Sequence, residues 1–214
     1  MALRWWLPAA FAILTTGYLL AARVFFTDRP FRMADAVISN LILSHDNPRG
    51  WLLAATAQLL CGFLLLPVTT ILQERLRSIN RWASGAGVWL QRAGLLAMMV
   101  MAWRAPIESD TWADLHINLA FGVYVGLSTG LLCFLWVSVR GALPGRGWLA
   151  GMALLQLTAL GLLAWLFFMP YPSEGYGPWT CLSALEYEMA VAIALTLFAL
   201  FWSLDVRDRR AGVS

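Results

Sequence analysis

The side chains of this sequence that could do chemistry are two histidines and a set of carboxylates between long apolar runs. Nine of the twelve acidic residues, and both histidines, fall in or beside three of the connections between those runs. His116 and Glu186 are the most informative, because an ionised group inside an apolar run is costly without a partner. A histidine and a carboxylate can act as general base and acid, or can bind a metal ion that activates water.

Other polar residues around the same connections are candidates for lining a ligand site. These are Ser39, Asn40, His45, Asp110, Asp114, Asn118 and Glu188. Asp114 is predicted to cap the apolar run that follows it, since a carboxylate is favoured at a helix N-terminus. Glu188 lies two residues after Glu186 and therefore points to a different helical face, so only one of the two is expected to face a bundle interior.

A metal centre would take His116, Asp110 and Glu186 as ligands, because most catalytic zinc sites use three protein ligands. The two histidines lack an HExxH or similar spacing, so the sequence identifies no particular metal and leaves the cofactor unknown. Two structural alternatives remain open. Glu186 could stay hydrated near the surface or pair with Arg104, and His116 could cap a helix at the level of the lipid headgroups.

Six apolar runs must position these residues. The chain has 214 residues, of which 60% are hydrophobic and 13% charged, and its mean hydropathy of +0.69 is too high for a soluble domain. Each run is long enough to cross a hydrocarbon core of about 30 Å, where only a helix satisfies its own backbone. We predict an all-α integral membrane bundle, one domain over residues 1–214, with spans at 5–26, 51–72, 85–103, 115–139, 147–169 and 181–202.

The arginines predict the orientation of this bundle. One side carries Arg4, Arg75, Arg77, Arg81, Arg140, Arg146, Arg207, Arg209 and Arg210, and the other carries Arg23, Arg29, Arg32, Arg49 and Arg104. The positive-inside rule makes the richer side, with both termini, cytoplasmic. Arginine without lysine is typical of a GC-rich bacterial source, so we expect a bacterial cytoplasmic membrane protein. The arginines lie at span ends, which favours contact with anionic lipid and argues against nucleic-acid binding.

Small and polar residues inside the spans give further expectations. Gly122, Gly126 and Gly130 recur every four residues, which predicts close packing of the fourth span against another helix. The same stretch matches the pattern G-x-S-x-G, but Ser128 lies deep in a span with no histidine at its depth, which argues against a serine nucleophile. Arg92 is expected to extend towards the cytoplasmic headgroups, or to bind a lipid phosphate between helices.

Several short segments together resemble the landmarks of a six-span membrane family. They are Ile38-Ser39-Asn40-Leu41, Asn47-Pro48, Asp110, Leu115-His116-Ile117 and Glu186-Tyr187. The family comprises the damage-regulated autophagy modulator group, its relatives in GPI-anchor lipid remodelling, and prokaryotic proteins of unassigned function. This chain has Asn40 where the family has Asp, and it lacks the Gly expected soon after. The resemblance implies that Ser39, Asn40, His116 and Glu186 converge at the outer ends of spans one, four and six.

These observations favour a membrane protein with a polar pocket at its extracytoplasmic face that binds a lipid or another amphiphile. A first alternative is a membrane-embedded lipid hydrolase or transferase that uses His116 and Glu186, with or without a metal. A second alternative is a structural subunit of a larger membrane complex. The expected partners are membrane lipids, with other membrane proteins or further copies of the chain as additional candidates. No nucleic-acid partner is expected.

Overall fold

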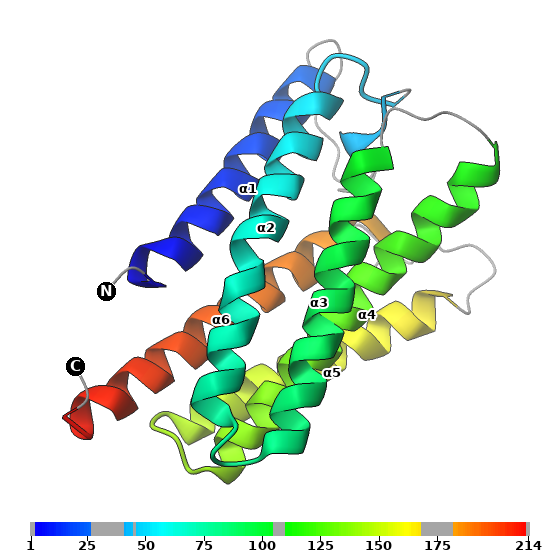
Figure 1. Ribbon diagram of the computed structural model, residues 1–214. Coiled ribbons are helices and arrows are strands. Elements are labelled where there is room, and N and C mark those ends of the chain that lie inside the picture. The colour runs from blue at the N-terminus through cyan, green and yellow to red at the C-terminus, as the bar shows by residue number, and fades with distance from the viewer. Residues whose placement is uncertain (1–2, 27–40, 45, 105–109, 168–181, 213–214) are drawn as a thin grey trace.

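The computed structural model describes residues 3–26, 41–44, 46–104, 110–167 and 182–212. Within these ranges the chain contains helices and turns and no β-strand. Its α-helices are α1 (Leu3–Phe25), α2 (Trp51–Leu76), α3 (Arg81–Arg104), α4 (Asp110–Arg140), α5 (Arg146–Phe167) and α6 (Leu182–Arg210). All six are long and apolar enough to cross a membrane, so the predicted all-α class is confirmed. The start of α1 and the end of α6 lie on the same side of the bundle (Figure 1).

The helices differ from the predicted spans chiefly at their polar ends. α6 continues from residue 202 to Arg210, where an ion pair of 2.5 Å between Arg209 and Asp205, four residues apart, stabilises the last turns. The prediction that Asp114 caps the fourth span is wrong, because α4 already begins at Asp110 and Asp114 lies one turn inside it. No proline or glycine separates the two aspartates, so nothing in the local sequence stops the helix from starting earlier.

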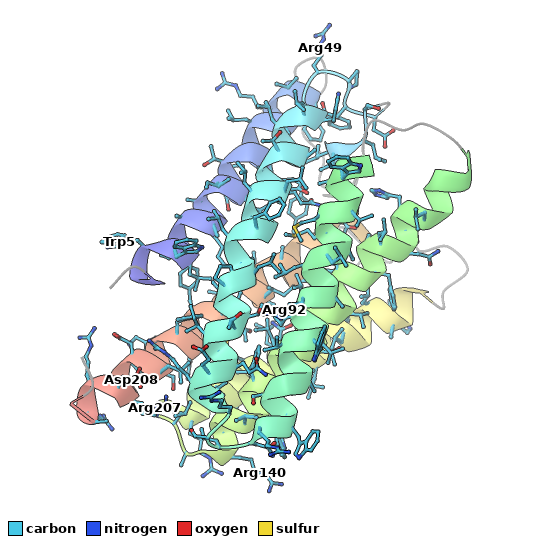
Figure 2. The ribbon with its side chains drawn as sticks, in the orientation of Figure 1. Trp5, Arg49, Arg92, Arg140, Arg207 and Asp208 are labelled. Atoms are coloured by element: carbon cyan, nitrogen blue, oxygen red, sulfur yellow. The ribbon has the colours of Figure 1, made fainter. Side chains whose placement is uncertain are left out.

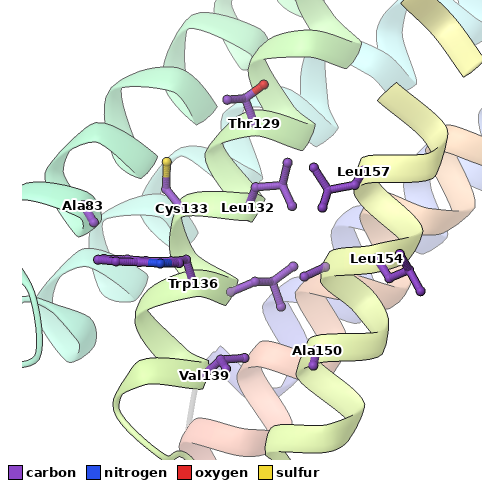
Figure 3. Close-up of a pocket in the computed structure, with 11 residues that line it drawn as sticks. Ala83, Thr129, Leu132, Cys133, Trp136, Val139, Ala150, Leu154 and Leu157 are labelled. Carbon is purple, nitrogen blue, oxygen red and sulfur yellow. The ribbon is translucent and has the colours of Figure 1, made fainter. Parts of the chain in front are cut away.

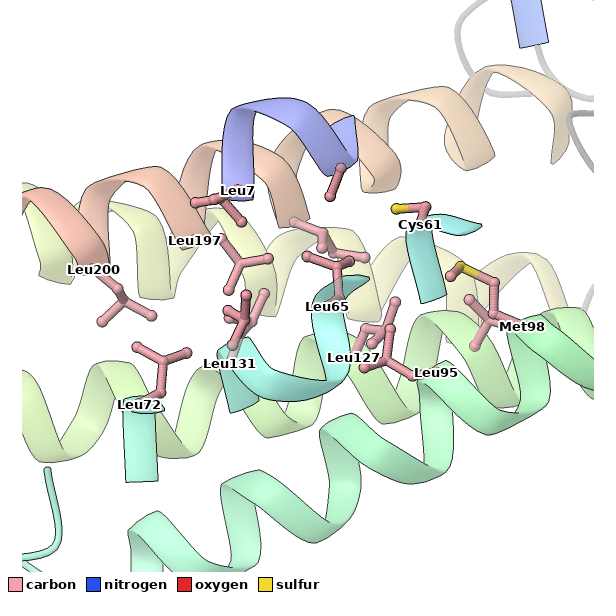
Figure 4. Close-up of a cluster of buried hydrophobic side chains, with 14 of the residues drawn as sticks. Leu7, Cys61, Leu65, Leu72, Leu95, Met98, Leu127, Leu131, Leu197 and Leu200 are labelled. Atoms are coloured by element: carbon pink, nitrogen blue, oxygen red, sulfur yellow. The ribbon is translucent and has the colours of Figure 1, made fainter. Parts of the chain in front are cut away.

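The core lies between α2, α3, α4 and α6, and α1 and α5 are the least buried helices. Figure 4 shows the centre of this core, where side chains such as Leu65 and Leu72 of α2, Leu95 of α3, Leu131 of α4 and Leu200 of α6 meet. Leu41 and Ile42, which precede α2, are also fully buried. The segment before α2 therefore packs into the bundle through these two side chains.

Glycines of both helices lie where α3 and α4 come into contact. A methyl group added to Gly126 would lie 2.8 Å from the backbone nitrogen of Gly94, and one added to Gly130 would lie 2.8 Å from the carbonyl oxygen of Gly87. Real Cβ atoms essentially never come so close, so the two backbones are in direct contact. The predicted close packing is confirmed for Gly126 and Gly130. At Gly122 the nearest atom would be 3.7 Å away, an ordinary contact.

Buried glutamines join neighbouring helices across the bundle. Gln58 of α2 donates to the carbonyl of Met98 in α3 at 2.7 Å, Gln91 of α3 donates to the carbonyl of Leu127 in α4 at 2.8 Å, and Gln156 of α5 donates to the hydroxyl of Thr196 in α6 at 2.9 Å. Such bonds between helices contribute roughly 0.6 to 2 kcal/mol each in a membrane. The few polar residues of the apolar runs therefore serve to hold the helices in register.

One end of the bundle, where α2, α4 and α6 finish and α3 and α5 begin, is called the arginine-rich end below. There Asp208 of α6 pairs with Arg75 of α2 at 3.2 Å, and Arg207 donates to the carbonyl oxygen of Arg75 at 3.3 Å. Figure 2 shows Arg140, Arg207 and Asp208 at this end and Arg49 at the opposite end. These contacts fasten the last turn of α6 to the last turn of α2.

Arg92 lies within the bundle, between the two ends (Figure 2). Its Nη2 donates to the hydroxyl of Thr70 at 2.8 Å and its Nε to the hydroxyl of Thr69 at 3.3 Å, both in α2. The guanidinium is therefore held against α2 by two hydroxyl groups. Neither of the two roles expected for it, extension to the headgroups or binding of a lipid phosphate, accounts for these bonds.

Candidate functional site

The structure describes only part of the predicted site. Ser39, Asn40 and His45 lie outside the described residues. Asp110 and Asp114 belong to the first turns of α4, but their side chains also lie outside the description. The predicted metal ligand set of His116, Asp110 and Glu186 therefore stays a prediction, as do the roles of Ser39, Asn40 and His45. Among the residues that are described, no three histidine, cysteine or acidic side chains lie together as metal ligands would.

Glu186 is the candidate that the structure places most clearly. It lies on the second turn of α6 and is only 4% exposed, between the buried Leu185 and Met189. Glu188, two residues on, is exposed. The expectation that only one of the two glutamates faces the interior is confirmed, and the inward one is Glu186. The alternative in which Glu186 stays hydrated near the surface does not fit its burial.

Two tyrosines from other helices lie within electrostatic range of Glu186. Its carboxyl group interacts electrostatically with Tyr18 of α1 and with Tyr124 of α4, and the two tyrosines interact with each other. The hydroxyl of Tyr18 donates to Oε1 of Gln58 in α2. We refer to Tyr18, Gln58, Tyr124 and Glu186 as the polar cluster. It combines one carboxylate, two phenols and an amide within an otherwise apolar interior.

The packing of α1 on α2 positions the first two members of the polar cluster. Gly17 lies against Ala57 so closely that a methyl group at Gly17 would overlap the Cβ of Ala57. This crossing brings the next residue of each helix, Tyr18 and Gln58, side by side. The amide nitrogen of Gln58 donates to Met98 in α3, which turns the amide oxygen towards the Tyr18 hydroxyl. Gln58 of α2 thus bonds to both α1 and α3, and it holds the Tyr18 hydroxyl in place.

The polar cluster lies nearer the end opposite the arginine-rich end. Tyr18 stands seven residues before the end of α1 at Phe25, and Gln58 stands seven residues after the start of α2 at Trp51. At 1.5 Å per residue, both lie about 10 Å from those helix ends. Glu186, four residues after the start of α6, lies about 6 Å from its end. These three members therefore lie one to two helical turns below the connections that the sequence marked as rich in acids.

His116 and Asn118 lie further out along α4 than Tyr124. His116 is half-buried with its Nε2 atom enclosed, and it precedes Tyr124 by two helical turns, about 12 Å along the axis. Asn118 is exposed, so its side chain points away from the interior. A direct pairing of Glu186 with His116 stays a prediction.

Asn47 is a residue whose structural role the sequence did not reveal. Its side chain is 1% exposed and donates to the carbonyl oxygens of Ala21, at 3.3 Å, and Leu41, at 3.1 Å. Its own amide oxygen accepts from the backbone nitrogen of Gly50 at 3.1 Å. Asn47 thereby ties the last turns of α1 and the segment before α2 to the start of α2. Part of the Asn47-Pro48 segment that carries the family resemblance is therefore explained by packing.

Tyr18, Gln58 and Tyr124 were absent from the residues predicted to form the site. One signal could have pointed to the first two, because each stands seven residues from the end of its helix, on either side of the same connection. Two antiparallel helices joined in this way bring residues at equal depth together. No comparable signal in the sequence indicates Tyr124.

Comparison with known protein families, with curated proteins and with solved structures finds nothing that matches the chain. The resemblance to the six-span family therefore stays a prediction.

Proposed function

We propose that the chain is a multi-pass protein of a bacterial cytoplasmic membrane, with both termini in the cytoplasm. The arginine-rich end would face the cytoplasm by the positive-inside rule. Two tryptophans near the ends of α3 support a transmembrane placement of this helix. Trp82 is 77% and Trp103 is 73% exposed. They are 21 residues apart, about 32 Å along a helix, which matches a hydrocarbon core of about 30 Å. Exposed tryptophans prefer the two headgroup levels.

A fusion to the C-terminus tests this orientation. Green fluorescent protein attached after Ser214 is expected to fluoresce in bacterial cells, because it matures in the cytoplasm and fails to do so when exported unfolded. Alkaline phosphatase at the same position is expected to be inactive, since it requires the oxidising periplasm. The opposite pair of results would contradict the proposed orientation.

We further propose that the polar cluster binds the headgroup of a lipid or other amphiphile that enters from the outer leaflet. The observation that carries this proposal is the burial of Glu186 within electrostatic range of Tyr18 and Tyr124. A carboxylate within a membrane bundle is expensive, and such groups usually mark a binding site or pathway. A buried carboxylate suits a headgroup that carries an ammonium group, because the opposite charges attract strongly where water is excluded.

Lipid binding to the purified, delipidated chain tests the proposal. Phosphatidylethanolamine carries an ammonium group and phosphatidylglycerol does not. We therefore expect a substitution of Glu186 to weaken the binding of the first lipid and not of the second, as measured by native mass spectrometry in detergent micelles. Glu186→Gln keeps the shape of the side chain and removes its charge. It is expected to weaken phosphatidylethanolamine binding by about tenfold or more, the size of a hydrogen bond to a charged group.

Glu188→Gln is the matched control, because it makes the same change on an exposed position of the same helix. It is expected to leave binding unchanged. Tyr124→Phe provides a milder second variant of the polar cluster and is expected to weaken binding a few-fold, as loss of one neutral hydrogen bond does. The proposal is wrong if Glu186→Gln weakens the binding of both lipids equally, or if Glu186→Gln and Glu188→Gln behave alike while both remain folded.

A further inference from the structure

A second feature of the molecule lies in the half of the bundle that contains the arginine-rich end. It is a groove between α4 and α5, closed on one side by the start of α3, with a volume of about 560 Å³ (Figure 3). Its walls are almost entirely apolar, and they include Ala83 of α3, Trp136 of α4 and Ala150 of α5. The volume falls within the range of roughly 300 to 1,000 Å³ that is usual for small-molecule sites.

The length and direction of the groove match one lipid leaflet. Along α4 its lining extends from Thr129 to Val139, ten residues or about 15 Å. This is half of a hydrocarbon core of about 30 Å. The groove therefore extends from near the middle of the membrane to the headgroup level, and it is open towards the lipid. An acyl chain of a lipid in that leaflet has the matching length and polarity.

Two arginines lie where the groove meets the headgroup level. Arg140, the last residue of α4, places its guanidinium 5.0 Å from the ring centre of Trp136, which lines the groove. Arg146, the first residue of α5, precedes the lining residue Ala150 by four positions and so shares its helical face. Both arginines are exposed. The ion pairs described at this end join other residues of α2 and α6, and none includes Arg140 or Arg146.

We propose that this groove binds an anionic phospholipid, with one acyl chain along the groove and the phosphate between Arg140 and Arg146. The charge at the mouth and the apolar walls are complementary to the two parts of such a lipid, and basic pockets between helices commonly bind anionic headgroups. The site lies in the opposite half of the bundle from the polar cluster. It is therefore a second lipid site, which rests on the membrane placement proposed above and not on lipid binding by the polar cluster.

Native mass spectrometry of the purified, delipidated full chain tests this inference. Phosphatidylglycerol is expected to bind more tightly than phosphatidylcholine with the same acyl chains. The double variant Arg140→Gln/Arg146→Gln is expected to lower phosphatidylglycerol affinity by about tenfold or more, since each arginine near anionic lipid contributes about fivefold. The control Arg77→Gln/Arg210→Gln removes the same charge from exposed positions at the same end, and it is expected to leave the affinity unchanged.

A second pair of variants tests the groove itself. Ala150→Leu narrows the groove and is expected to weaken phosphatidylglycerol binding, whereas Ala164→Leu, at an exposed position of α5 outside the lining, is not. The inference is overturned if the two lipids bind equally, or if either test variant behaves like its control. It is also overturned if Ala150→Leu dissociates a dimer and leaves lipid binding unchanged, because a second copy of the chain would then occupy the groove.

Discussion

Replacing Gly126 with alanine is expected to destabilise the bundle, because the helices at this position leave no room for a methyl group. The added Cβ would lie 2.8 Å from the nitrogen and 2.9 Å from the Cα of Gly94, and 3.0 Å from the carbonyl oxygen of Leu90. All three are backbone atoms of α3, so no side-chain rotation can relieve the contact. The helices must move apart, and this also strains the hydrogen bond from Gln91 to Leu127.

The size of the effect follows from a comparison with Gly122→Ala, one turn earlier on α4. Both substitutions gain the same helix propensity, about 1 kcal/mol, but the nearest atom to the new methyl group at Gly122 is 3.7 Å away. The difference in the free energy of unfolding between the two variants therefore isolates the steric term. Overpacking of this kind costs about 1 to 3 kcal/mol. For a chain of this size that corresponds to a melting temperature roughly 2 to 12 °C lower.

Thermal unfolding in a mild detergent, followed by the helical circular dichroism signal, measures this difference. We expect Gly126→Ala to melt several degrees below Gly122→Ala, and Gly122→Ala to melt at or slightly above the unsubstituted protein. Equal melting temperatures for the two variants would mean that α3 and α4 are not in backbone contact at Gly126. The reasoning about the glycine contact would then be refuted, whatever the absolute stabilities are.

Three further predictions concern the polar residues. Gln58→Leu is expected to lower the free energy of unfolding by about 1 to 2 kcal/mol in the same assay, because it removes the bonds to Tyr18 and Met98. Asn47→Ala is expected to cost about 1 to 3 kcal/mol, since it leaves buried backbone groups unpaired, and an unchanged melting temperature would contradict its structural role. His116→Ala separates the lipid-binding proposal from the hydrolase alternative. If the chain is a metal-dependent hydrolase, the unsubstituted protein contains a metal ion by elemental analysis and His116→Ala loses it. If the polar cluster binds a lipid headgroup as proposed, Glu186→Gln reduces phosphatidylethanolamine binding more than His116→Ala does.

Part of the candidate site was predictable because burying a charge has a large energetic consequence. Glu186 stood out in the sequence as a carboxylate inside an apolar run, and the structure buries it. Tyr18, Gln58 and Tyr124 did not stand out, because neutral polar side chains are tolerated in many orientations. Their importance depends on contacts with other helices, such as the bond between Tyr18 and Gln58, which no spacing along one helix reveals.

The sequence by itself determined the class of the molecule, its six helices and most of their bounds. These follow from local requirements, because an apolar run of membrane length must form its hydrogen bonds within itself. It also identified Gly126 and Gly130 as a close-packing face. Only the tertiary structure decided that α3 meets this face and that Tyr18, Gln58, Tyr124 and Glu186 share one cluster. The rotation and tilt of each helix decide such contacts, and they depend on the packing of all six helices at once.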